Sequence, residues 1–184
     1  MQPVTIEQAQ NDAQLRALIE LHFDFVWRSL RRLGVPDAQL DDAVQVVWIT
    51  VSQKRQQIRP DTARSFLFAI ALRVASGVRR AVRRRREVAE DPPESIDERP
   101  GPHEELERKR NRAILDEVLD AMPEEVRAVF VLYELDQQNM AEIAGILGVP
   151  PGTVASRLRR GRELFESEMK RIRARKAFRP GGAR

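Results

Sequence analysis

Residues 139–162 read NMAEIAGILGVPPGTVASRLRRGR, the pattern of two helices joined by a tight turn. Apolar side chains at helical spacing give the first helix one buried face, formed by Met140, Ile143, Ala144 and Leu147. Gly148 can end that helix because glycine tolerates left-handed backbone geometry, and Val149 can fill the space between the helices. Pro151 suits the first position of the second helix. The stretch therefore predicts a helix-turn-helix.

The second helix of this motif has an inner and an outer face. Apolar or small residues at steps of four, three and four form the inner face, namely Val154, Leu158, Gly161 and Phe165. The outer face carries hydroxyl groups and arginines, which can contact phosphates and guanine edges in the DNA major groove. We expect its DNA-binding residues to be Thr153, Ser156, Arg157, Arg159 and Arg160. An alternative is that these arginines only solvate a surface helix, with Glu163 and Glu166 as their partners.

Residues 11–88, upstream of the motif, predict a helical domain of three amphipathic helices. Apolar residues recur mostly at three- and four-residue steps within 11–33 and again within 37–58. A third helix is expected to begin at Asp61 or Thr62, either of which can cap it, and to run into a block of arginines. Its apolar positions also fit a helix, so no strand is needed.

Residues 106–176 predict a second small helical domain, which ends in the helix-turn-helix. Pro123 is expected to open one of its helices, since proline is favoured at a first helical position. Residues 89–105 contain many prolines and acids and little to bury, so they are expected to form a flexible acidic linker. Residues 177–184 are expected to be a disordered tail. The fold class is therefore all-α, with two small helical domains joined by the linker.

Charge is unevenly distributed along the chain. The 184 residues include 32 Lys and Arg against 28 Asp and Glu, a net charge of only +4. Residues 79–86 nevertheless contain six arginines, whereas residues 87–107 contain nine acids and one arginine. A basic block beside an acidic one indicates a polyanion-binding surface next to a solvated tether.

The composition also excludes several classes of site. Without cysteine there is no disulfide, thiolate zinc site or cysteine nucleophile, and His22 and His103 lie too far apart in sequence to suggest a metal pair. We therefore expect no metal, no cofactor and no catalytic residue. No apolar run approaches the length of a membrane span, and the first residues lack the pattern of a signal peptide. The protein is expected to be cytoplasmic, without membrane insertion.

The chain, from about Leu15 to Arg173, resembles the extracytoplasmic-function sigma factors of the sigma-70 family. Residues 119–165, LDAMPEEVRAVFVLYELDQQNMAEIAGILGVPPGTVASRLRRGRELF, are similar to sigma region four, the family's −35 promoter-binding unit. Residues 40–51, LDDAVQVVWITV, resemble the region-two helix that docks on the polymerase clamp helices. This second likeness implies core-polymerase contacts at Asp41, Asp42, Gln45 and Trp48.

Residues 62–86, TARSFLFAIALRVASGVRRAVRRRR, resemble the family's helix that opens the −10 element. Holding an unstacked base takes cations with aromatic or hydroxyl groups beside a basic helix. The resemblance implies −10 contacts from Arg59, Thr62, Arg64, Ser65, Arg73, Arg79, Arg80 and Arg83. Phe66 is expected to be buried, and at least one of Phe66 and Phe68 to be core. Four residues depart from the family pattern, namely Val46, Arg73, Gly77 and Ala155. They affect which promoter sequence is expected more than they affect the expected function.

The resemblance implies a non-enzymatic alternative sigma factor that binds core RNA polymerase and directs promoter-specific transcription initiation. Its expected partners are core polymerase, promoter DNA and an anti-sigma factor, with no small-molecule substrate. One alternative is a helix-turn-helix regulator that acts without being a polymerase subunit. Another is a nucleic-acid enzyme, which would need an assembled nucleophile. The only tyrosine, Tyr133, lies in an apolar run where a core or rim position is the natural interpretation.

Overall fold

The computed structural model describes residues 6–54, 58–59, 62–88 and 103–178 of the chain. Every regular element in these ranges is helical, as the all-α prediction required. The elements are α1 (Ile6–Arg32), a 3₁₀ turn (Asp37–Gln39), α2 (Leu40–Lys54), α3 (Ala63–Val88), α4 (His103–Asp120), α5 (Glu124–Phe130), a π-helical turn (Val131–Leu135), α6 (Met140–Leu147) and α7 (Pro151–Phe178).

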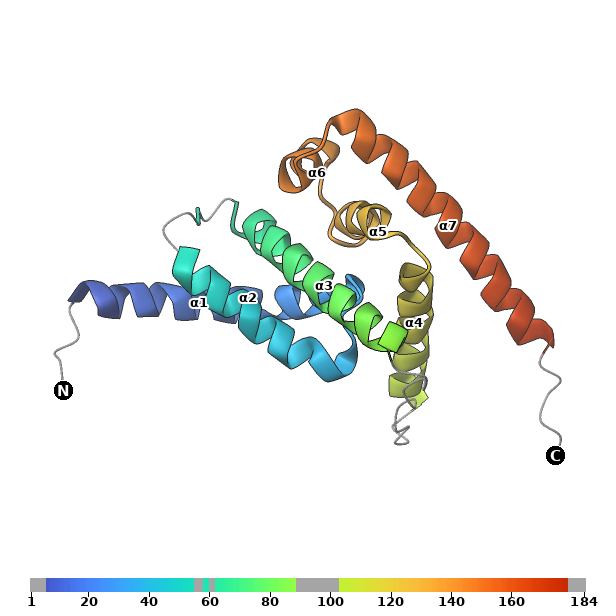
Figure 1. Ribbon diagram of the computed structural model, residues 1–184, viewed down its shortest axis with the longest axis horizontal. Helices are drawn as coiled ribbons and strands as arrows, with labels where there is room; N and C mark the ends of the chain where they lie inside the picture. Colours follow the sequence, from blue (N-terminus) through green and yellow to red (C-terminus); the bar gives the residue numbers. More distant parts are fainter. Residues whose placement is uncertain (1–5, 55–57, 60–61, 89–102, 179–184) are drawn as a thin grey trace.

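Helices α1, α2 and α3 pack against one another and form an N-terminal unit (Figure 1). Each contributes apolar side chains at three- and four-residue steps, so burial of one face per helix provides most of the stabilising free energy. Fully buried members of this core are Val26, Leu30, Val47, Val51, Leu67 and Phe68. The chain reverses between α1 and α2 at Gly34, whose φ of 86° lies in the left-handed region that glycine tolerates.

Helices α4 to α7 form a C-terminal unit, whose buried apolar side chains join those of the N-terminal unit in one hydrophobic core. Asn139 begins α6 with a capping box, in which its side chain accepts from the backbone N–H of Glu142 while the Glu142 carboxylate accepts from that of Asn139. Gly148 ends α6 with φ 64°, and α7 begins at Pro151, so the predicted turn is confirmed. The rings of Phe130 and Phe165 stack at 5.5 Å and join α5 to α7.

Gly161 provides the close approach between α5 and α7. A Cβ atom at this position would lie 3.0 Å from a ring carbon of Phe130 and 3.4 Å from a methyl group of Val126. Inner-face residues Val154 and Leu158 are fully buried, and Phe165 packs against the same core. The inner face predicted from residue spacing is therefore confirmed.

Several details of the sequence prediction need correction. Helix α1 begins five residues earlier than position 11, and α4 begins at His103, within the range assigned to the linker. Pro123 precedes α5 as its N-cap instead of occupying the first helical position. Phe68 is fully buried and lies on the inner face of α3, whereas Phe66 is only half-buried at the edge of that face. The predicted linker residues 89–102 and tail residues 179–184 lie outside the described residues.

The two units also contact each other. Helix α6 packs beside α3, and α4 contacts α1 (Figure 1). Ion pairs between described residues of the two units include Arg31 with Asp116 and Arg32 with Asp136.

Candidate nucleic-acid interface

The outer face of α7 presents the predicted recognition residues. Ser156, Arg159 and Arg160 are exposed, whereas Thr153 and Arg157 are half-buried. The Ser156 hydroxyl donates to the Thr153 carbonyl oxygen at 3.0 Å, which satisfies it in the absence of DNA. Hydroxyl and guanidinium groups at the start of a helix that emerges from a turn have the arrangement required for the major groove.

Glu163 holds the two most exposed arginines of this face. Arg160 Nη1 lies 3.3 Å from one Glu163 oxygen, and Arg159 Nε lies 3.9 Å from the other. Exposed ion pairs of this kind contribute little free energy, so either arginine can be transferred to a phosphate at small cost. Glu163 thus pairs with Arg159 and Arg160 in the free chain, as the alternative interpretation expected. This pairing remains compatible with DNA binding.

Arg162, which sequence reasoning did not select, supports α7 from the side. Its Nε donates to the Glu134 carboxylate at 2.7 Å, and its guanidinium lies over the Tyr133 ring at 5.4 Å. These contacts connect α7 to the π-helical turn that follows α5. Tyr133 is half-buried at the rim of the core, as expected, and therefore has a structural role.

Helix α2 carries a second exposed surface. Asp41, Asp42 and Gln45 are exposed as predicted. Trp48 is only 9% exposed and belongs to the hydrophobic core, so in the free chain it supports α2 from inside and lies apart from the exposed face. Its position follows from the apolar spacing of α2, which puts it on the buried face with Val44, Val47 and Val51.

Two apolar residues complete the exposed face of α2. Val46 is 47% and Ile49 is 50% exposed, and together with Asp42 and Gln45 they occupy positions three or four residues apart on one side of the helix. Exposed aliphatic groups beside a carboxylate suit a protein partner better than DNA. Sequence spacing alone could have found Ile49, since it follows Asp42 by two helical turns.

The residues predicted to contact the −10 element lie before and along α3. Arg59, Thr62, Arg64, Arg73, Arg80 and Arg83 are exposed, and Ser65 and Arg79 are half-buried. The Arg64 guanidinium stacks over the Phe25 ring at 4.6 Å, which fixes the start of α3 against α1. The Thr62 hydroxyl donates to the Arg59 carbonyl oxygen at 3.4 Å. Asp61, the other predicted cap, lies outside the described residues.

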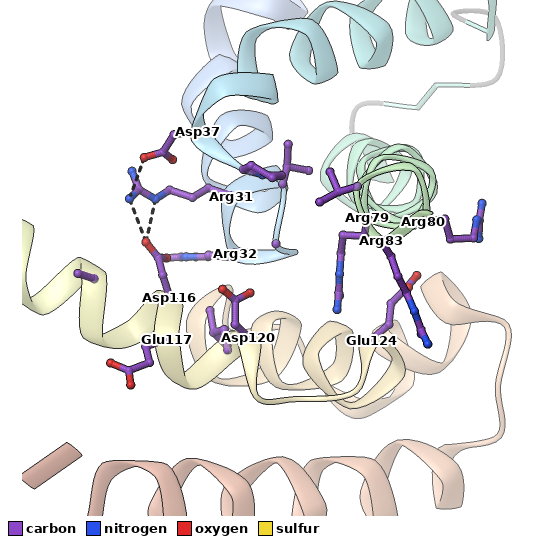
Figure 2. Close-up of a pocket in the computed structure, with 16 residues that line it drawn as sticks. Arg31, Arg32, Asp37, Arg79, Arg80, Arg83, Asp116, Glu117, Asp120 and Glu124 are labelled. Carbon is purple, nitrogen blue, oxygen red and sulfur yellow. Dashed lines mark hydrogen bonds and ion pairs between the residues drawn. The ribbon is translucent and has the colours of Figure 1, made fainter. Parts of the chain in front are cut away.

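Part of this α3 surface faces the C-terminal unit. Arg79, Arg80 and Arg83 line a cavity of about 880 Å³ whose opposite wall includes Asp120 and Glu124 (Figure 2). Arg79 and Arg83 point across the cavity toward α4 and α5, while Arg80 points away and donates to Ser76 at 2.8 Å. The structure thus separates the predicted α3 arginines into two groups, with Arg73 and Arg80 outside the contact and Arg79 and Arg83 inside it.

Burial at the contact shifts three ionisable groups. Burial raises the pKa of Asp116 although Arg31 opposes the shift. It likewise raises the pKa of Asp136, against the attraction of Arg32 and more distant arginines. Burial, reinforced by repulsion from Arg79, lowers the pKa of Arg127 to about 10. Each of these groups therefore lies in a setting that disfavours its charged form.

Other kinds of site find no support in the described residues. They contain no cluster of three or more histidine and acidic side chains that could hold a metal ion. None of the described helices is both long and apolar enough to cross a bilayer. His22 is half-buried, and its pKa is lowered by burial and by the nearby Arg64.

The arrangement defines a helical protein with an acidic and apolar docking face, a basic helix and a helix-turn-helix. Two family models match it in that order, sigma-70 region 2 over residues 18–87 and sigma-70 region 4 over residues 112–165. The chain belongs to the sigma-70 family, and the curated relatives that it resembles are named ECF RNA polymerase sigma factors.

Curated relatives and solved structures agree with this assignment. The sigma factor SigE of Mycolicibacterium smegmatis is 34% identical over 151 residues, which span 79% of this chain but only 58% of that protein. The sigma-E factor of Escherichia coli is 29% identical over 90% of this chain and 93% of its own length. The fold is similar to that of RpoE from Bartonella quintana, solved with the anti-sigma factor NepR (TM-score 0.68, 18% identity, 85% of this chain and 97% of that one). It is also similar to CnrH, solved with the cytosolic domain of CnrY (TM-score 0.64, 21% identity, 88% and 94%).

Proposed function

We propose that this protein is an alternative sigma factor, which binds core RNA polymerase and directs it to a specific set of promoters. The observation that carries the proposal is the presence in one chain of two surfaces of different chemistry. The α2 face combines Asp42 and Gln45 with exposed Val46 and Ile49, whereas α7 presents Arg159 and Arg160. A protein that joins a transcribing enzyme to duplex DNA needs one surface of each kind.

In the proposed mechanism, α7 enters the major groove of the −35 element. Arg159 and Arg160 exchange Glu163 for phosphate oxygens or guanine edges, and Ser156 and Thr153 contact the backbone near the start of the helix. The capping box of α6 and the Arg162–Glu134 pair hold α7 rigidly, so the recognition residues lose little conformational freedom on binding.

The segment leading into α3 is proposed to hold the −10 element as it melts. Arg59, Thr62 and Arg64 provide exposed cations and a hydroxyl group for an unstacked base, while Arg73 and Arg80 follow the phosphate backbone along the helix. These contacts should weaken steeply with salt, because each phosphate that an arginine neutralises releases a counterion. No covalent step is required of the protein, which acts by binding and separating strands in the cytoplasm.

The exposed face of α2 is proposed to dock on core polymerase and to be covered by an anti-sigma factor when transcription is not required. Two solved structures with the same fold contain a bound partner, the anti-sigma factor NepR in one and the cytosolic domain of CnrY in the other. An apolar strip of Val46 and Ile49 flanked by Asp42 suits such competition, since one small surface serves both partners.

Run-off transcription with core polymerase on a promoter library tests the proposal directly. The wild-type chain should start RNA synthesis at a defined set of sites, and Asp42→Lys should reduce both the capture of core polymerase and the transcript yield. Glu107→Lys makes the same charge change on an exposed position of α4 and should leave both unchanged. A chain that binds duplex DNA but neither captures polymerase nor starts transcription would instead be a helix-turn-helix regulator.

A further inference from the structure

The cavity of about 880 Å³ between α3 and α4 is lined by arginines that the proposed promoter contacts do not use. Arg79 and Arg83 extend into it from α3. Asp120 and Glu124 stand on the opposite wall (Figure 2). Gly34, in the turn after α1, forms another part of the lining. A concave space of this volume has the size that proteins use to bind small molecules.

Carboxylates of the cavity wall balance only part of the positive charge. Asp116 accepts from Nε and Nη2 of Arg31 at 3.1 and 2.9 Å, so this pair is satisfied. Asp120 lies 3.0 Å from Nη2 of Arg127, a buried residue of α5 beside the cavity. Glu124 attracts Arg127 at longer range. The acids therefore leave other guanidinium donors around the cavity unused.

Two guanidinium groups at the base of the cavity keep such unused donors. Arg127 is 1% exposed, and its Nε and Nη1 have no hydrogen-bond partner among the described residues. Nη1 of Arg79 is buried in the same way and also has no partner there. A buried N–H without a partner costs free energy, so its presence in a native protein calls for a bound ion, a water or another specific role.

The same two groups repel each other across the Gly34 turn. A side-chain carbon at position 34 would collide with the Arg127 guanidinium and would lie 3.4 Å from Cδ of Arg79. Burial lowers the pKa of Arg127, and the charge of Arg79 lowers it further. Like charges held side by side are unfavourable alone, whereas an anion between them favours the charged form of both. The base of the cavity thus combines excess positive charge with unused donors.

We propose that this cavity binds a small phosphate-bearing molecule and that the phosphate group lies between Arg79 and Arg127. Guanidinium groups donate charge-assisted hydrogen bonds to phosphate oxygens, often two at a time, and the unused donors of these side chains are available for them. Arg79 belongs to α3 and Arg127 to α5, so the ligand ties the two helical units together. The site does not depend on the function proposed above.

Isothermal titration calorimetry in a phosphate-free buffer at constant ionic strength tests the site. The probes are inorganic phosphate, pyrophosphate and adenosine triphosphate, and the wild-type chain should bind at least one of them saturably, one molecule per chain. Similar affinities would mean that the phosphate group alone is recognised, whereas tighter binding of the nucleotide would mean that the cavity also holds its nucleoside. At about 100 times its Kd, the ligand should raise the midpoint of thermal unfolding by roughly 5–10 °C.

Four variants locate the bound phosphate. Arg79→Gln and Arg127→Met each remove one of the two cations and should weaken binding about tenfold or more. Arg84→Gln makes the same charge change as Arg79→Gln at an exposed position of α3 outside the cavity lining, and it should bind like the wild type. Glu124→Gln removes a carboxylate that competes with the phosphate and should bind more tightly, a gain that misfolding cannot imitate.

The outcomes decide the proposal independently of transcription. Weak binding by Arg79→Gln and Arg127→Met, with normal binding by Arg84→Gln, would establish the site. The absence of saturable binding of every probe to the wild-type chain would overturn it. Equal affinities of Arg79→Gln and Arg84→Gln would also overturn it, since they would indicate a general counterion effect, and so would weaker binding by Glu124→Gln. A chain that binds phosphate but does not start transcription would refute only the proposed function.

Discussion

Replacing Arg127 by methionine should stabilise the protein, because the native side chain is a buried charge in an unfavourable setting. Burial lowers the pKa of this guanidinium from its usual range to about 10, which corresponds to roughly 3 kcal/mol in favour of the neutral form. Asp120, its ion-pair partner, is 70% exposed and regains water when the pair is lost. Methionine keeps an unbranched apolar stem in the same space. Replacement of buried ion pairs by apolar residues has gained about 1–4 kcal/mol elsewhere, and we expect a gain within that range.

Urea unfolding followed by circular dichroism would measure this change, and the melting temperature should rise by about 2–4 °C for each kcal/mol in a chain of this size. Arg162→Met is the matched control. Arg162 is exposed and paired with Glu134, so its loss should change stability only slightly, because water screens an exposed ion pair. A loss of more than about 1 kcal/mol in Arg127→Met would refute the reasoning, since it would mean that the buried charge stabilises the fold.

Three further predictions concern other parts of the chain. Gly161→Ala should lower the free energy of unfolding by about 1–3 kcal/mol in urea titrations, because the added carbon presses on Phe130. Arg160→Ala should weaken promoter-specific run-off transcription by roughly 1–3 kcal/mol if it reads a base; an unchanged promoter preference would remove it from the readout. Burial raises the pKa of Asp136 above 3.8, so the folded chain holds this proton more tightly than the unfolded chain. Wild-type stability relative to Asp136→Asn should therefore fall as pH rises from 3.8 through the raised pKa, and a rise in pH-dependent unfolding curves would contradict this.

The local structure of the helix-turn-helix was predictable because its signals lie close together in sequence. A left-handed glycine at position 148, a proline at 151 and apolar steps from Val154 to Leu158 each specify a turn or a helix face without reference to distant residues. The structure confirms all of them. The exposure of Arg159 and Arg160 followed from the same spacing, whereas Arg157 is half-buried.

The prediction for Trp48 disagreed with the helical spacing, because the family motif was used both to identify α2 and to choose its exposed residues. Trp48 was assigned to the docking surface from the family motif, although its spacing from Val44 and Val51 places it on the buried face of α2. A family motif identifies a helix, whereas periodicity decides which side of that helix is exposed. Where the two disagree, the periodicity should decide.

Packing between the two units could not be predicted from local pattern. The pairs that join them connect Arg31 to Asp116 and Arg32 to Asp136, 85 and 104 residues apart. The chain contains many arginines and acids, so composition does not indicate which of them will meet. Nor does the sequence reveal that Gly34, besides allowing its own turn, leaves open the space that the Arg127 guanidinium occupies.

Helix α7 is a single rod of 28 residues, about 42 Å long at the usual rise per residue. Its first turns present the recognition residues, and near its other end Arg175 donates to Glu117 of α4, the helix that also bears Asp116. A tilt of about 10° in a DNA groove would swing the far end of such a rod by roughly 7 Å. The rod is thus a lever, by which seating one end on a promoter would move α4, the helix whose Asp116 pairs with Arg31 of the N-terminal unit.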